Sequence, residues 1–186
     1  MKAVILAAGK GKRLHSEETK LPKCMVRANG RPLLDYVLDY TSFIPREDKI
    51  IVVGFYKEVI EAHLPGYSFA FQREQKGTGD AVMAAYDLLA DYGGDVLVIN
   101  GDMPLIRESS LRALLELHRR EANDCTVLTY YESGELPPFG RVLRGADGRV
   151  CDIREYKDAN ESERAVRELN GGIYVFDCKK LFDCLQ

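Results

Sequence analysis

Short apolar runs rich in β-branched residues alternate, over the first 130 residues, with longer stretches whose apolar positions recur every three or four residues. The short runs predict strands at Ala3–Leu6, Lys49–Val53, Ser68–Phe71, Asp95–Ile99 and Cys125–Thr129. The periodic stretches predict helices over Pro32–Phe43, Tyr56–Leu64, Gly79–Asp91 and Ser109–Glu121. This alternation is typical of an α/β fold with a doubly wound, mostly parallel, Rossmann-like sheet that helices cover on both faces.

The pattern changes after residue 131. Arg141–Arg144 and Val150–Arg154 flank the turn at 145–149 and predict a small antiparallel hairpin extension, and Gly172–Phe176 predicts one more strand. The polar stretch Asn160–Glu168 is compatible with a helix. Residues 179–186 have helical spacing but no stop signal. We therefore expect residues 1–186 to form a single domain that continues beyond residue 186.

For two of the predicted helices, the sequence also predicts the position of individual residues. Thr78 stands before the helix at 79–91 as a plausible N-cap, and His118 is expected on the surface of its helix. The positions expected on the buried face of the helix at 79–91 are Ala81, Ala84, Ala85, Leu88 and Leu89.

Composition and charge limit the classes of partner. A length of 186 residues with 46% hydrophobic residues suits one compact domain with a sizeable core. The net charge of −3 and the pI of about 5.7 give no overall attraction to nucleic acid or to an anionic membrane. The longest apolar runs are too short to span a bilayer, and the start lacks a signal-peptide pattern. We expect a cytoplasmic protein without nucleic-acid or membrane partners, and no segment indicates its oligomeric state.

The five cysteines form an odd set without a CxxC pair. This pattern argues against a disulfide framework and against a zinc cluster. It predicts free thiols, most of them buried.

Candidate chemistry begins in the turn after the first strand. Gly9 and Gly11 allow backbone N–H groups to approach an anion, and Lys10, Lys12 and Arg13 add positive charge. The first strand-to-helix turn of an open α/β sheet commonly handles phosphate. A solvated basic turn is the plain alternative. The spacing fits neither a P-loop nor a dinucleotide-binding fingerprint, and the missing third glycine also argues against a dehydrogenase.

LAAGKGKRL at 6–14, read together with LPKCM at 21–25, resembles the signature of the sugar-phosphate nucleotidyltransferases. The resemblance implies a sheet of the nucleotide-diphospho-sugar transferase type and a loop that wraps the phosphates of a nucleoside triphosphate. It also implies that Arg13 neutralises the departing pyrophosphate and that Lys23 contacts phosphate oxygens near the reacting phosphorus. The loop positions implied in nucleotide binding are Leu6, Ala8, Gly9 and Gly11.

Later segments match one branch of this family, the uridyltransferases that make UDP-N-acetylglucosamine. The stretch FQREQKGTGDAV at 71–82 follows a predicted strand and opens a predicted helix. The resemblance implies that Gln72, Gln75, Gly77 and Thr78 surround the uracil. A glycine turn with a capping threonine is an equally good interpretation of this stretch alone.

A carboxylate ends a buried strand in VLVINGDMPL at 96–105. Asp102 falls at the edge of the sheet where ligands bind, and Mg²⁺ needs few protein carboxylates when phosphate oxygens complete its shell. We therefore expect Asp102 to anchor Mg²⁺, although it could instead cap the turn or the helix after Pro104. The resemblance places Asn100, where many relatives carry an aromatic residue, at the sugar.

Two segments in the last third of the chain are implied in sugar binding. In residues 137–159 and 167–177, the family pattern falls on Gly140, Glu155 and Asn170. The resemblance implies that these residues hold the amino sugar. As isolated residues they carry little information, since a glutamate in a charged hairpin is usually solvated.

The implied reaction joins UTP and N-acetylglucosamine-1-phosphate to give UDP-N-acetylglucosamine and pyrophosphate, a step of cell envelope biosynthesis that uses Mg²⁺. Two alternatives stay open. One is transfer between another nucleoside triphosphate and another sugar-1-phosphate. The other is a catalytically incomplete nucleotide-binding regulatory domain. Asn100 and the glycine at position 171 favour this alternative because both depart from the family pattern.

Overall fold

The computed structural model describes residues 1–9 and 21–185, which form two compact units. Unit 1 comprises Met1–Thr126 and Tyr174–Gln186, and unit 2 comprises Val127–Ile173. The predicted hairpin extension belongs to unit 2.

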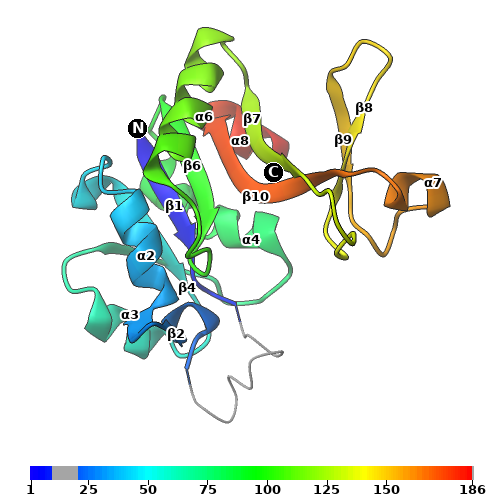
Figure 1. The fold of residues 1–186 in the computed structure, drawn as a ribbon. Coiled ribbons are helices and arrows are strands. Elements are labelled where there is room, and N and C mark those ends of the chain that lie inside the picture. Colours follow the sequence, from blue (N-terminus) through cyan, green and yellow to red (C-terminus); the bar gives the residue numbers. More distant parts are fainter. Residues whose placement is uncertain (10–20, 186) are drawn as a thin grey trace. The chain divides into compact units, whose positions relative to one another are not determined.

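Figure 1 labels most of the elements along the chain. The strands are β1 (Lys2–Leu6), β2 (Arg27–Ala28), β3 (Arg31–Pro32), β4 (Lys49–Val53), β5 (Ser68–Phe71), β6 (Asp95–Asn100), β7 (Cys125–Tyr131), β8 (Arg141–Arg144), β9 (Val150–Arg154) and β10 (Glu168–Asp177). The α-helices are α2 (Leu33–Tyr40), α3 (Lys57–His63), α4 (Thr78–Met83), α5 (Tyr86–Leu89), α6 (Glu108–Arg120), α7 (Glu161–Arg164) and α8 (Cys178–Leu185). Short 3₁₀ helices are formed by η2 (Lys23–Met25) and η3 (Arg46–Asp48).

A parallel sheet in the order β5-β4-β1-β6 forms the centre of unit 1. The end of β10 adds an antiparallel strand beside β6, with Tyr174 opposite Val98 and Asp177 opposite Asp95. The chain thus places β4 and β5 on one side of β1 and β6 on the other. Ligands of open α/β sheets bind beyond the carboxyl ends of the strands at such a reversal of strand order.

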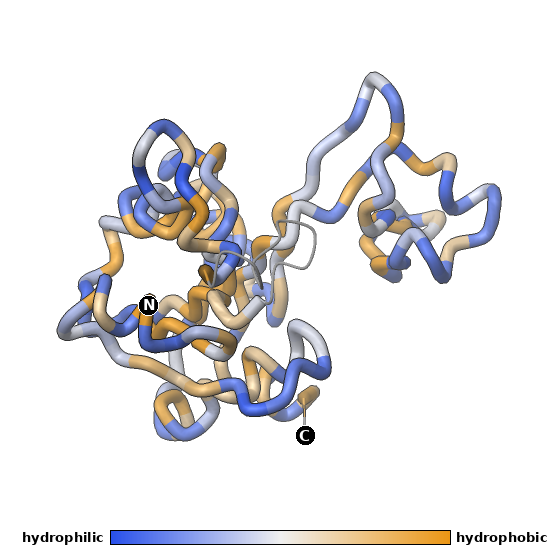
Figure 2. Tube along the Cα trace, turned by 90° about the horizontal axis from the view of Figure 1, so that it is seen from below, coloured by the Kyte–Doolittle hydropathy of each residue, from blue (hydrophilic) through white to orange (hydrophobic). Residues whose placement is uncertain are grey.

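Helices cover both faces of this sheet, which confirms the predicted fold class. The helices α4, α5 and α8 pack on one face, where Val4, Val98 and Phe182 belong to the same buried cluster. The helices α2, α3 and α6 lie on the other side of the sheet in Figure 1 and bury Leu34 and Leu111, among others. Hydrophobic segments, orange in Figure 2, run through the middle of the unit. Alternate residues of each strand therefore meet two apolar layers.

Unit 2 contains the hairpin β8–β9 with the predicted bounds. Arg141 pairs with Arg154 across the hairpin and with Leu169 of β10, and β10 also pairs with β7. The short helix α7 begins with a capping box, in which the Asn160 side chain accepts a hydrogen bond from the Glu163 backbone N–H at 2.9 Å. Glu168, expected at the end of a polar helix, begins β10 instead.

The helix predicted over 79–91 is broken into α4 and α5. The backbone N–H of Ala85 donates to Val82 O at 3.0 Å, a three-residue turn that rotates the chain between the two helices. As a result Leu88, expected on the buried face, is 45% exposed. The N-cap of α4 is Gly77 and Thr78 is the first helical residue, with no capping hydrogen bond from its side chain, so the predicted cap is wrong.

The burial of His118 and of the cysteines differs from what the sequence predicts. His118 is only 3% exposed, and its Nδ1 lies 2.9 Å from the hydroxyl of Thr126, a partner that the following strand supplies. All cysteines are free, as predicted, but only Cys24 and Cys178 are buried while the other three are exposed.

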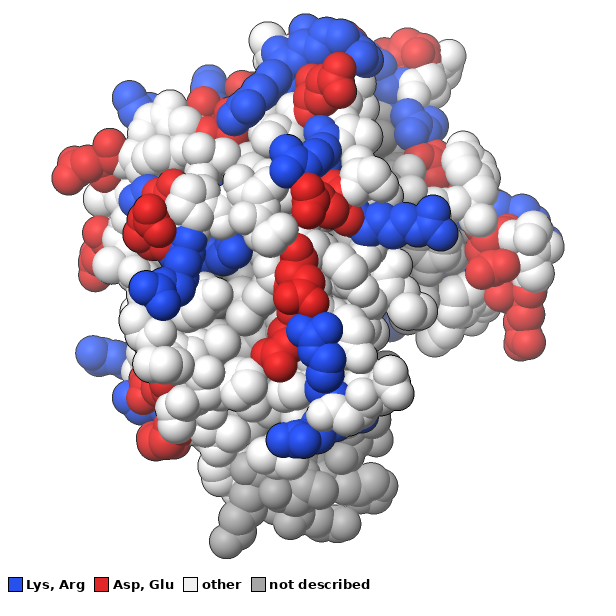
Figure 3. Space-filling model, turned by 60° about the vertical axis from the view of Figure 1, so that its left-hand side comes forward, with Lys and Arg blue, Asp and Glu red and all other residues white. Residues whose placement is uncertain are grey.

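Charges of both signs are interspersed over the face shown in Figure 3. Exposed ion pairs such as Arg31–Asp39, at 2.8 Å, join charges of opposite sign in unit 1. The broad basic surface that nucleic acid requires is not present on this face. Within residues 1–9 and 21–185, no helix has both the length and the apolar character needed to cross a bilayer.

Candidate active site

A cavity of about 440 Å³ lies in unit 1 at the carboxyl ends of β1, β5 and β6. Its volume is typical of a site for a small molecule. Ten of the residues singled out from the sequence line it: Leu6, Ala8, Gly9, Lys23, Gln72, Gln75, Gly77, Thr78, Asn100 and Asp102. Segments that are far apart in the sequence are thus brought together where strand order reverses.

The turn after β6 presents Asp102 to the cavity. The N–H of Gly101 donates to Leu6 O at 2.9 Å, which holds this turn against the end of β1. A Cβ atom at position 101 would lie 3.2 Å from Leu34 Cδ1 and 3.3 Å from Leu6 O. Glycine therefore permits the close approach that sets the position of the next residue, Asp102.

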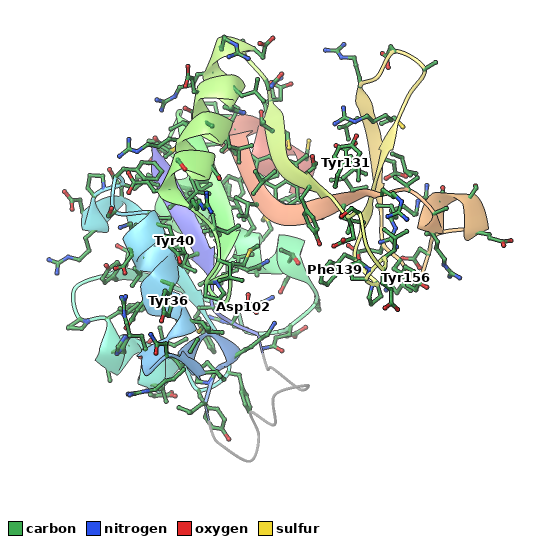
Figure 4. The ribbon with its side chains drawn as sticks, viewed as in Figure 1. Tyr36, Tyr40, Asp102, Tyr131, Phe139 and Tyr156 are labelled. Carbon is green, nitrogen blue, oxygen red and sulfur yellow. The ribbon has the colours of Figure 1, made fainter. Side chains whose placement is uncertain are left out.

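The same turn is held from α2. Tyr40 Oη donates a hydrogen bond to Pro104 O, two residues after Asp102. Figure 4 shows Tyr40 on α2 and Asp102 beyond the end of β6. Backbone and side-chain contacts thus fix the loop that carries the carboxylate.

Lys23 and Asp102 form an ion pair between Nζ and Oδ2. Lys23 lies in η2, and the two side chains are 46% and 20% exposed, so both remain accessible from solvent. The sequence predicted a phosphate contact for the lysine and a metal for the aspartate. The structure shows the two groups in direct contact at the cavity.

The role of Asp102 in holding Mg²⁺ stays a prediction. Its carboxylate lines the cavity and is paired with the Lys23 ammonium. Among the described residues no group of three or more His, Cys, Asp or Glu gathers to hold a metal ion. Mg²⁺ commonly uses one or two carboxylates together with substrate phosphates, so a single aspartate is consistent with this ion and not with a site built from protein ligands alone.

Gln72 is a buried polar residue at the end of β5. Its backbone N–H donates to Val53 O at 2.9 Å, and its side chain is held by Nε2, which donates to Asp80 Oδ2 at 2.7 Å and to Gly77 O at 3.3 Å. Both partners accept hydrogen bonds, so the amide NH₂ must face them and Oε1 points away from them. Asp80 therefore fixes the orientation of Gln72. Sequence reasoning missed Asp80, although it stands in the first turn of the helix that follows the glycine turn.

The turn between β5 and α4 also contacts the first loop. Gly77 has φ +129°, a backbone conformation that other residues rarely adopt, and Gln75 Nε2 donates to Ala8 O. Gly11 and Arg13 lie outside the described residues. Their roles stay predictions.

Cys24 lines the cavity beside this ion pair. Its side chain is 3% exposed, and Sγ lies 3.9 Å from Ala7 O. Burial, and to a lesser extent the negative charge of Asp102, raise the pKa of the Cys24 thiol to about 12. The thiol is therefore protonated and unreactive at neutral pH.

We expect Cys24 to resist alkylation at pH 8, because the thiolate is the nucleophile and this thiol ionises only near pH 12. The exposed Cys151 and Cys184 serve as internal controls and should react with iodoacetamide. Peptide mass mapping measures the labelling of each. Labelling of Cys24 at the rate of the two controls would contradict its burial.

The residues predicted to bind the sugar are divided between the units. Asn100 lines the unit 1 cavity, whereas Gly140, Glu155 and Asn170 lie together in unit 2. The N–H of Asn170 donates to Gly140 O at 2.9 Å, and a Cβ at position 140 would lie 3.4 Å from both Asn170 Cβ and Glu155 Oε1. We call Gly140, Glu155 and Asn170 the unit 2 cluster. It joins the residue directly before β8, the residue directly after β9 and a residue of β10.

Residues 3–170 match the model of the MobA-like NTP transferase domain. The chain belongs to the MobA-like NTP transferase family. Within this family it is close to the amino-terminal domain of the bifunctional protein GlmU. It is 44% identical over 187 aligned residues to GlmU of Streptococcus equi subsp. zooepidemicus and 43% identical over 185 to GlmU of Streptococcus thermophilus. These alignments cover 99% of this chain and 39% of each relative, so the chain spans about two fifths of the GlmU relatives.

Solved structures of other NTP transferases share the fold. A putative glucose-1-phosphate thymidylyltransferase from Bacillus anthracis superposes with a TM-score of 0.79 at 21% identity, covering 98% of this chain and 73% of that one. A UDP-glucose pyrophosphorylase complexed with UDP-glucose also gives 0.79, at 20% identity, covering 99% and 78%. At this identity the likeness shows the architecture alone.

Proposed function

We propose that this member of the NTP transferase family catalyses uridylyl transfer from UTP to N-acetylglucosamine-1-phosphate, giving UDP-N-acetylglucosamine and pyrophosphate. The observation that carries the proposal is the unit 1 cavity, in which Lys23 and Asp102 meet beside Gln72 at the reversal of strand order. The 44% identity to GlmU supports the choice of substrates.

The reaction requires a phosphate oxygen of the sugar-1-phosphate to attack the α-phosphorus of UTP while pyrophosphate leaves in line. Such transfers need positioning and charge neutralisation more than covalent chemistry from the protein. Lys23 supplies a compact positive charge for phosphate oxygens, and Gln72 offers its Oε1 atom to a base. Mg²⁺, held by Asp102, would contribute further neutralisation of phosphate charge.

A pyrophosphate-release panel tests the proposal. The full-length protein is assayed with Mg²⁺, with UTP, CTP, dTTP or GTP as donor and with N-acetylglucosamine-1-phosphate, glucosamine-1-phosphate or glucose-1-phosphate as acceptor. We expect the highest kcat/KM for UTP with N-acetylglucosamine-1-phosphate. A higher value for another pair would correct the substrates, and binding of UTP without turnover of any pair would favour a regulatory domain.

Asp80→Ala should weaken nucleotide binding, because it removes the charged acceptor that orients the Gln72 amide. A hydrogen bond to a charged group contributes about 1.5–3 kcal/mol, so we expect KM for UTP to rise by about tenfold or more. Asp80→Asn, which retains an acceptor oxygen, should lie between the parent and the alanine variant.

The matched control for Asp80 is Glu74→Ala, which removes an exposed carboxylate paired with Lys76. Its KM for UTP should equal that of the parent. Equal KM values for Asp80→Ala and the parent in steady-state assays would show that Asp80 does not act through Gln72.

A further inference from the structure

Arg141 is a fully buried cation in unit 2. It has 0% exposure, at the first position of β8 and directly after Gly140 of the unit 2 cluster. Placing a guanidinium in a protein interior is costly, and burial of arginine is rare unless a carboxylate pairs with it. Among the described residues, no carboxylate lies within ion-pair distance of Arg141. Charge pairing therefore does not explain its burial.

The guanidinium is held by backbone carbonyls from two segments. Its Nη1 donates to Pro137 O at 3.0 Å and to Phe139 O at 2.6 Å, and its Nε donates to Arg164 O at 3.0 Å. These bonds connect the loop before β8 with the end of α7. The planar fork of arginine suits this arrangement, because several donors leave one rigid group in fixed directions.

A third segment stacks on the same group. The Cζ atom of Arg141 lies 5.3 Å from the centre of the Tyr156 ring, and Cζ of Arg164 lies 4.9 Å from it. Arg164 Nε also donates to Tyr156 O at 3.1 Å. Phe139 and Tyr156, both in unit 2, are labelled in Figure 4. Tyr156 is thereby fixed by two cations and a backbone bond.

The segments that Arg141 connects carry the unit 2 cluster. Phe139 precedes Gly140 and Tyr156 follows Glu155, while Asn170 is bonded to Gly140 by its backbone. A shift of the Phe139 loop or of Tyr156 would therefore change how closely Asn170 and Glu155 lie to Gly140, where an added Cβ would meet both at 3.4 Å. An apolar side chain of similar size could fill the interior of this unit, but it could not join these carbonyls.

We propose that Arg141 is a positioning residue for the sugar-1-phosphate: it fixes the mutual placement of Gly140, Glu155 and Asn170 through the Phe139 loop and Tyr156. The proposal rests on the proposed function and on the family resemblance, which implies that the unit 2 cluster holds the amino sugar. Because the Arg141 side chain is buried, it does not contact the substrate and acts only through the residues that it positions.

Arg141→Lys tests the inference in the full-length enzyme. Lysine keeps the positive charge but cannot reproduce the fork, so the cluster loosens while the unit 1 cavity is unchanged. Since a misplacement of about 1 Å can cost a hundredfold, we expect KM for N-acetylglucosamine-1-phosphate to rise roughly ten- to a hundredfold. KM for UTP should stay within about twofold of the parent, because unit 1 holds the nucleotide-binding residues.

Arg144→Lys is the matched control on the same strand. Arg144 bonds Glu168 through Nε at 2.7 Å and Nη2 at 2.6 Å, outside the unit 2 cluster. This variant should lower the melting temperature without changing KM for the sugar phosphate.

If Arg141→Lys does not fold, Tyr156→Leu replaces it as the test variant, because Tyr156 is 37% exposed and its loss removes only the stacked ring. We expect this variant to raise the same KM.

Three outcomes would overturn the inference. The first is an unchanged KM for the sugar phosphate, either in an Arg141→Lys variant whose melting temperature is lowered or in a folded Tyr156→Leu variant. The second is an equal rise in KM for both substrates. In either case an active parent enzyme would leave the proposed function intact. The third is a parent enzyme without turnover of any sugar-1-phosphate, which would remove the proposed function and the inference together.

Discussion

Asp102→Asn is expected to lower kcat about a thousandfold, because an asparagine of the same shape lacks the negative charge that pairs with Lys23 and would anchor Mg²⁺. The fold should survive, since the side chain is 20% exposed and the turn is held by backbone bonds and by Tyr40. Pyrophosphate release at saturating substrates and Mg²⁺ measures kcat, and circular dichroism measures the fold.

The control for this variant is Asp39→Asn. Asp39 also forms an ion pair with a basic residue in unit 1, Arg31, but its side chain is 58% exposed and lies on α2. It should leave kcat unchanged. A kcat for Asp102→Asn within about threefold of the parent would mean that the carboxylate takes no part in the transfer.

Lys23→Met is expected to lower kcat about a hundredfold, the usual loss when one group that stabilises transition-state charge is removed. Lys23 is 46% exposed and paired with one carboxylate, so its loss should change the free energy of unfolding by no more than about 1 kcal/mol. Lys23→Arg should recover only part of the activity, because a planar guanidinium does not replace a compact ammonium. Steady-state kinetics for both substrates measure the loss.

Lys76→Met is the matched control for Lys23, since Lys76 is 70% exposed and pairs with Glu74. The double variant of Lys23 and Asp102 adds a second check. Because the two groups are in contact, its loss should be smaller than the product of the two single losses. Full activity in Lys23→Met, or strict additivity of the two losses, would contradict a joint role.

The strands could be predicted closely because their apolar runs have abrupt ends. The bounds of β4, β5, β8 and β9 agree with the expected ones, and β1 and β6 each extend by one residue. A parallel sheet buried on both faces needs continuous apolar strands, which a sequence records directly. The prediction of one helix over 79–91 was wrong because the spacing of apolar residues does not reveal the three-residue backbone turn at Ala85.

The site could be predicted as a set of positions but not as a set of contacts. Gln72 and Asp102 were found from their places after apolar strands and from family resemblance, and both line the cavity. The pairs Lys23–Asp102 and Gln72–Asp80 depend on how the turns bring separate segments together. Arg141 gave no signal, because arginine in a hairpin is ordinarily solvated and only the fold shows it buried.

A crystal structure of the protein with UTP and Mg²⁺ would show whether the unit 1 cavity binds the nucleotide. We expect the triphosphate near Gly9, Lys23 and Asp102, with the base beside Oε1 of Gln72. Nucleotide bound elsewhere, without contact to Asp102 or Gln72, would contradict this expectation.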